Sequence, residues 1–240
     1  MRRIDNVDKL NKKAREGKGY LHENFKARVI NENPYIVKIN NFLDDEEVEC
    51  LLEMAEGKFK RSNIVVDGNL TYSNTRTSST AYVTKDGFPS YCNCGAEDCQ
   101  EVNYPAPIER IVKRLRYLTG CKREELEGFM VVRYRYMEQF AEHTDYFEPH
   151  EIGALDCAGN RIVTVFVYLN TLEKDEGGET EFTKLGVKSR PKKGDAMLWY
   201  NQDPITKEML PLTEHKGNPV TKEGVVKYGA NMWIRDQSFF

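Results

Sequence analysis

Residues 162–169, Ile-Val-Thr-Val-Phe-Val-Tyr-Leu, form a run of β-branched and aromatic residues in the second half of the chain. This composition is typical of a β-strand. Three more runs of the same kind occupy residues 129–136, 196–200 and 228–234. Successive strands with turn residues between them favour an antiparallel sandwich or barrel.

Helical patterns lie in the first half of the chain. A short alternating strand is predicted at residues 35–39, and residues 41–47 favour a helix start because their acidic side chains suit the positive end of a helix. The apolar residues that follow have helical spacing: Val48, Leu51, Leu52 and Ala55. A second helix is predicted from Pro107 to Gly120. Helices early and strands late predict an α+β fold with N-terminal helices packed against the strands.

Composition limits the class of protein. The chain has 240 residues, 40% of them hydrophobic, and a formal net charge of −3. We expect one domain over residues 31–240, preceded by a basic arm or helix over residues 1–30. The charge argues against nucleic acid or an anionic membrane as partner. Because no apolar run approaches the roughly 20 residues of a membrane span and no secretory signal is visible, we expect a soluble intracellular protein.

Three of the six cysteines cluster at Cys92, Cys94 and Cys99. A zinc knuckle needs a fourth ligand, and no histidine lies close to them in sequence. We therefore interpret this segment as a polar loop with reduced thiols.

A metal site must draw on only four histidines. His143 and Asp145 are two residues apart, so both side chains face the same way if the chain is extended there. His215 lies 72 residues further on. Two imidazoles and one carboxylate can bind Fe(II) on one face and leave other positions open. On spacing alone, the alternative of ordinary polar residues at strand ends stays open.

Lys227 adds a second signal, because it lies within an apolar strand pattern twelve residues after His215. A lysine that points into a barrel is costly unless it meets an anion. A dicarboxylate bound to iron at one end would present its other carboxylate to this ammonium group. The alternative is a lysine at a strand edge that faces water.

With these residues in place, the chain resembles the collagen-type prolyl 4-hydroxylases, which are Fe(II)- and 2-oxoglutarate-dependent dioxygenases. The resemblance is to the short form found in algae, plants, bacteria and large DNA viruses, so a viral source is compatible with it. It runs from about Asn41 to Asp236. Its markers include the segments 41–43, 76–79, 131–134, 143–145, 161–164, 168–170, 177–180, 194–198, 215–220 and 227–233.

The resemblance implies a double-stranded β-helix (jelly roll) and a role for each matching residue. His143, Asp145 and His215 correspond to the iron ligands, and the catalytic set also includes Lys227. The 2-oxoglutarate site is implied to contain Lys227, Tyr134 and Thr180. The positions associated with substrate binding are Arg76, Ser78, Glu127, Arg161 and Trp233. As alternatives, Glu127 and Arg161 form a structural ion pair, and Trp233 is a core aromatic residue.

The implied activity is 4-hydroxylation of peptidyl proline in proline-rich or collagen-like sequences, with Fe(II), 2-oxoglutarate, O2 and ascorbate as reductant. Succinate and CO2 would be the other products. A proline-rich peptide or protein would be the partner, and we expect a monomer or weak dimer. One alternative is a hydroxylase of the same class that acts on lysyl residues, another protein target or a free amino acid. Another is a non-catalytic peptide-binding module.

The chain departs from the family pattern at three places. The spacing from His215 to Lys227 is two residues longer than usual, which makes Lys222 a rival, although Lys227 alone keeps the Lys-aromatic-x-x-Asn-x-Trp pattern. Phe140 stands where related enzymes often carry tyrosine. Residues 86–101 are predicted to be an insertion near the substrate-binding loops.

Overall fold

A computed structural model describes residues 7–17, 20–66, 69–83, 104–148 and 159–238. Its larger sheet has eight strands, in the order β1 (Lys26–Asn31), β2 (Ile36–Asn40), β12 (Ala196–Tyr200), β9 (Arg161–Tyr168), β14 (Lys227–Arg235), β7 (Phe129–Tyr134), β6 (Ser79–Val83) and β3 (Lys60–Arg61). A smaller sheet has the order β11 (Val187–Ser189), β10 (Thr180–Phe182), β13 (His215–Gly217) and β8 (Phe140–His143). A third pair joins β4 (Ile64–Val66) and β5 (Asn69–Thr71).

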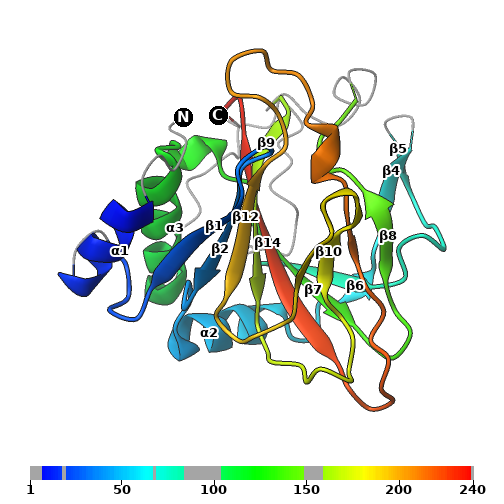
Figure 1. Cartoon of the computed structure of the whole chain (residues 1–240). Coiled ribbons are helices and arrows are strands. Elements are labelled where there is room, and N and C mark those ends of the chain that lie inside the picture. Colours follow the sequence, from blue (N-terminus) through cyan, green and yellow to red (C-terminus); the bar gives the residue numbers. More distant parts are fainter. Residues whose placement is uncertain (1–6, 18–19, 67–68, 84–103, 149–158, 239–240) are drawn as a thin grey trace, which may run out of the picture.

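The helices are α1 (Val7–Arg15), α2 (Asp45–Ala55) and α3 (Ala106–Thr119), with short 3-10 helices at Arg123–Glu125, Thr183–Leu185 and Pro211–Thr213. Asp44 caps α2 with its side chain, and α3 ends at Gly120, whose positive φ favours glycine. The three α-helices lie to one side of the larger sheet, and the smaller sheet lies to the other (Figure 1). The predicted α+β class with a jelly-roll core is confirmed.

Side-chain alternation along the central strands separates two cores. On β9, Val163, Val165 and Val167 pack in the core beneath the helices, whereas Phe166 and Tyr168 pack in a second core with Phe182 of the smaller sheet. Successive residues of a strand point to opposite faces, so one strand serves both cores. The face that carries the even-numbered residues of β9 therefore becomes the wall of the space between the sheets.

The predicted boundary between residues 30 and 31 lies inside β1. This strand pairs with β2 and buries Ala27, so the sheet begins before that boundary. Asn11 of α1 exchanges two hydrogen bonds with the Ala27 backbone and ties the leading helix to the same strand. None of the helices among the described residues is both long and apolar enough to cross a membrane.

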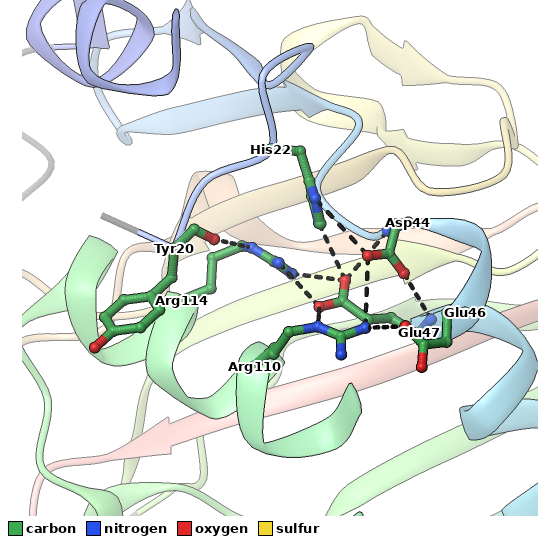
Figure 2. A network of polar contacts seen from close by, with 7 residues as sticks. All are labelled: Tyr20, His22, Asp44, Glu46, Glu47, Arg110 and Arg114. Atoms are coloured by element: carbon green, nitrogen blue, oxygen red, sulfur yellow. Dashed lines mark hydrogen bonds and ion pairs between the residues drawn. The ribbon is translucent and has the colours of Figure 1, made fainter. Parts of the chain in front are cut away.

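A buried ion-pair network joins α2, α3 and the segment around residue 22 (Figure 2). Arg114 donates to both carboxylate oxygens of Glu47, at 2.8 and 2.9 Å, and His22 lies 3.2 Å from the same group. Burial opposes ionisation of Glu47, but the contacts with His22 and Arg114 outweigh it and lower its pKa to about 2. Arg110, on the solvent side, reaches Glu46 at 2.6 Å.

Replacing Arg114 with methionine is expected to lower the free energy of unfolding by about 3–5 kcal/mol. Buried Glu47 would lose its two-point guanidinium partner and keep only His22 and the longer contact with Arg110, at 3.4 Å. Arg110→Met is the matched control. Since Arg110 is partly exposed, its loss is expected to cost no more than about 1 kcal/mol. Urea denaturation of the two variants measures the difference. Equal losses in the free energy of unfolding would show that burial does not make the Arg114–Glu47 ion pair more important for stability.

Candidate active site

The three predicted ligands converge between the sheets. His143 ends β8, His215 begins β13, and the two residues are register partners in the smaller sheet. Asp145 follows two residues after His143, and ligand atoms of all three residues lie within 4.8 Å of one another. The sequence placed His143 just after a strand that ends near Met137. Instead β7 ends at Tyr134, and the separate strand β8 carries His143.

Backbone contacts fix which nitrogen of each imidazole is free. His143 Nδ1 lies 2.8 Å from the Ala141 carbonyl, and His215 Nδ1 lies 2.9 Å from the Thr213 carbonyl. Because a carbonyl only accepts, each Nδ1 carries the proton and each Nε2 keeps its lone pair. The Nε2 atoms lie 4.0 and 3.9 Å from oxygens of Asp145. This is the arrangement that a metal ligand set requires.

The electrostatics of the cluster suit a divalent cation. Burial, followed by the nearby His215, lowers the pKa of His143 to about 3, so this imidazole is neutral at pH 7. Burial opposes ionisation of Asp145, but the two histidines and Arg161 outweigh it and hold its pKa below the ordinary value. Two imidazoles and one carboxylate form the facial donor set that fits Fe(II).

A hydrogen-bond chain orients Asp145 from the larger sheet. Thr164 on β9 donates its hydroxyl to Asp145 Oδ2 at 2.7 Å, and Asn201 donates to that hydroxyl oxygen at 2.9 Å. All three residues are buried. Neither Thr164 nor Asn201 was predicted as a site residue, although Thr164 lies within a marker segment of the family.

Replacing Thr164 with valine is expected to weaken metal binding by about tenfold, because the isosteric side chain cannot hold the Asp145 carboxylate. Anaerobic Fe(II) titration measures the change. Thr206→Val is the control, since Thr206 lies exposed in a loop. An affinity equal to that of the unmodified protein would show that the hydroxyl does not orient the ligand.

Aromatic rings surround the two imidazoles. Phe140 stacks on His143 with ring centroids 3.5 Å apart and an interplanar angle of 15°, and Trp199 meets His215 edge-on at 4.7 Å. The guanidinium of Arg76 lies over the Phe140 ring at 4.5 Å. Phe140, at a position where the family resemblance implies tyrosine, therefore presents an apolar ring against a metal ligand.

Lys227 is the buried cation that the sequence indicated. It begins β14 opposite Tyr134 and is 1% exposed. Its Nζ lies over the rings of Tyr134, Phe166 and Tyr168 at 4.8, 5.3 and 5.9 Å. Burial lowers its pKa to about 7, and among the described residues no carboxylate lies within ion-pair distance. An ammonium group in this setting is a site for an anion.

The rival lysine has a different environment. Lys222 is exposed, and its Nζ pairs with Glu176 at 3.1 Å and Asp175 at 3.7 Å. Its charge is already balanced at the surface. The structure therefore places Lys227, and not Lys222, inside the barrel.

Tyr134 and Thr180 flank the same space, and both are buried. Thr180 is paired with Gly217 across the smaller sheet. A Cβ atom at Gly217 would lie 3.3 Å from the Tyr134 hydroxyl, so glycine keeps room for that group. Gly178 has a φ of +73°, and a Cβ there would lie 2.9 Å from Leu172 and 3.2 Å from the Lys227 side chain. Gly178 thus makes room for the lysine stem.

One cavity of about 1280 Å³ connects these groups. Its lining includes the triad, Lys227, Tyr134, Thr180, Arg76, Arg161 and Trp233. Ser78 and Glu127 are not among the described lining residues. Ser78 is buried, and its hydroxyl oxygen lies 2.9 Å from that of Ser62. Glu127 accepts two hydrogen bonds from Arg161, at 2.6 and 2.9 Å.

Arg161 links this ion pair to the cavity wall, since its guanidinium lies 3.5 Å from the Trp233 ring centroid. Arg235, which the sequence did not single out, is buried, lines the cavity and also contacts Glu127. Nothing in its strand pattern distinguishes it from a neighbour on β14. The cysteines Cys92, Cys94 and Cys99 and the predicted insertion over residues 86–101 lie outside the described residues.

Comparison with known proteins gives concordant matches. Residues 129–235 match the 2OG-Fe(II) oxygenase superfamily. The chain is 31% identical over 219 residues to "Probable prolyl 4-hydroxylase 6" of Arabidopsis thaliana. The aligned region covers 82% of this chain and 68% of that protein. It is 28% identical to "Prolyl 4-hydroxylase subunit alpha-2" of Caenorhabditis elegans but spans only 36% of that protein.

A solved structure is also similar. The crystal structure of a viral collagen prolyl hydroxylase from Paramecium Bursaria Chlorella virus-1, a 2OG complex, has a TM-score of 0.59 at 26% identity and covers 86% of this chain and 98% of that one. The superfamily match begins with β7 and ends with β14, so it includes the triad and Lys227.

Proposed function

The chain belongs to the prolyl 4-hydroxylase family of 2OG-Fe(II) oxygenases, and from this premise we propose that it hydroxylates C4 of peptidyl proline in proline-rich or collagen-like sequences. When bound, Fe(II) and 2-oxoglutarate supply the oxidising chemistry, in which one oxygen atom of O2 enters proline and the other enters succinate as CO2 leaves. Ascorbate serves as the reductant that keeps the metal active.

The protein residues bind and orient the reactants. His143, Asp145 and His215 would hold the metal from one side, which leaves the side toward the cavity open. The Lys227 ammonium would pair with the distal carboxylate of 2-oxoglutarate, with the hydroxyls of Tyr134 and Thr180 beside it. The rings of Phe166 and Tyr168 exclude water and strengthen this ion pair.

The remaining cavity wall suits an extended peptide. Arg161 and Trp233 form one stacked pair on this wall, and Arg76 forms another with Phe140. Arginine and aromatic side chains are well suited to bind peptide carbonyls and proline rings. We take Glu127 to position Arg161 from behind, since the two residues form an ion pair. Ser78 would act in the same way on Tyr134, to which it is hydrogen-bonded. The protein would act inside the cell as a monomer or weak dimer.

The observation that carries the proposal is Lys227, a buried cation without a carboxylate partner among the described residues, in the same cavity as a facial metal triad. The decisive experiment measures succinate release with Fe(II), 2-oxoglutarate and ascorbate on poly-proline and collagen-like peptides. Mass spectrometry then locates the added oxygen. Peptides in which alanine replaces proline are the control.

The alternatives have distinct outcomes in the same assay. Oxygen added to lysine-containing peptides or free amino acids, and to no proline peptide, would replace the prolyl assignment. Peptide binding without succinate release above the buffer blank would indicate a binding module.

A further inference from the structure

Three basic residues stand at the rim of the cavity. Lys58 follows α2, and Lys60 and Arg61 form β3, the outermost strand of the larger sheet. All three are exposed, and all three line the same cavity as the metal triad. The rim is therefore continuous with the proposed reaction site.

These rim charges lack acidic partners in the part of the chain that the structure describes. Among the described residues, no carboxylate lies within 4 Å of the charged nitrogens of Lys58, Lys60 or Arg61. The contacts of Arg61 with described residues are with the Ser73 carbonyl, at 3.5 Å, and with the Tyr72 ring. Several other surface cations of the chain do form ion pairs: Arg110, Lys184, Lys188, Lys193 and Lys222. The rim thus gathers three cations without an acidic partner among the described residues, in a chain with a net charge of −3.

Arg76 continues the positive charge inward. It donates to the Asn63 carbonyl at 2.9 Å, two residues beyond β3, and lies over Phe140, which stacks on His143. Its Nε is buried without a hydrogen-bond partner in the structure, and no carboxylate of the described residues pairs with it. A donor that is buried and unpaired favours an acceptor supplied from outside.

The acidic residues of the lining do not balance these charges. They are Asp145, which belongs to the metal triad, and Glu142, which accepts a hydrogen bond from Thr183. Behind the cavity wall, Glu127 pairs with Arg161. Apart from Lys227, which the proposed function assigns to 2-oxoglutarate, the described lining thus carries its unpaired positive charge at the rim and at Arg76. Under the proposed function, the parts of a peptide next to the reacting residue would lie there.

We infer that the rim selects peptides that carry aspartate or glutamate next to the target proline. This inference rests on the proposed function and names its substrate class. Acidic side chains would pair with Lys60 and Arg61, and steering by the basic rim would raise the association rate. An acidic peptide is favoured over a nucleic acid because the proposed function places a proline residue of the substrate in the cavity behind the rim.

The test compares peptides that differ only by aspartate or asparagine on either side of one proline. Anisotropy measures binding, and succinate release gives kcat/KM. At low ionic strength we expect the acidic peptide to bind about tenfold more tightly, with the ratio falling toward twofold at high salt, because the contacts are exposed. The double variant K60E/R61E is expected to reverse the preference. Lys26→Glu, on the opposite edge strand β1, is the matched control and should preserve it.

The outcomes are distinct from those that test the proposed function. If no peptide is hydroxylated, the proposed function fails, and the binding ratio still decides the rim inference. Equal binding of both peptides, or an acidic preference that persists in K60E/R61E, would overturn it. Tighter binding of a single-stranded oligonucleotide of the same charge would also overturn it in favour of a nucleic acid.

Discussion

His143→Ala is expected to lower succinate release by about three orders of magnitude and to weaken Fe(II) binding by at least about a hundredfold. The imidazole supplies one of only three donor atoms in the cluster, and its Nδ1–H is already committed to the Ala141 carbonyl. Among the described residues, the only other histidine within 4.8 Å of Asp145 is His215. Anaerobic titration of Fe(II), with and without 2-oxoglutarate, measures the loss.

His22→Ala is the matched control for this variant. His22 also lies with two acidic residues, Asp44 and Glu47, at a spacing that could hold a metal ion. Their oxygens are already paired with Arg110 and Arg114, so a cation there would meet two guanidinium groups (Figure 2). The His22 variant should therefore keep the iron affinity. If His143→Ala binds iron as well as the unmodified protein does, the ligand assignment is wrong.

Long elements of the fold could be predicted from the sequence, and short ones could not. The strands β7, β9, β12 and β14 and the helices α2 and α3 are long enough to show their periodicity and caps. The strands β10, β11 and β13 have three residues each, which is too short for a pattern. They form because they pair with strands that are distant in sequence, as Thr180 pairs with Gly217. The sheet that carries two of the metal ligands is therefore the part that local sequence describes least.

The residues of the candidate site likewise fall into a group that the sequence indicated and a group that it did not. Residue type and spacing indicated the triad and Lys227, because few side chains can bind iron or a buried carboxylate. The supporting residues were not predictable, since Thr164 meets Asn201 only because β9 lies beside β12. The sequence pattern favoured Lys227 over Lys222, and the burial of Lys227 and exposure of Lys222 agree with that choice.

Lys227→Met is expected to raise the KM and Kd for 2-oxoglutarate by about a hundredfold while leaving Fe(II) affinity within about twofold. The ammonium group is buried among aromatic rings, where loss of one partner of an ion pair costs about 3 kcal/mol or more. Methionine keeps most of the volume and removes the buried charge. The variant without cosubstrate should therefore be at least as stable as the original protein.

Lys222→Met is the control, because that lysine pairs with Glu176 at the surface. The dependence on pH gives an independent check. Only the protonated amine attracts a carboxylate, and burial lowers the pKa of Lys227 to about 7. The affinity of the unmodified protein for 2-oxoglutarate should hence be constant below pH 7 and fall about tenfold per pH unit above it. This dependence should vanish in Lys227→Met and persist in Lys222→Met. The opposite pattern would assign the cosubstrate carboxylate to Lys222.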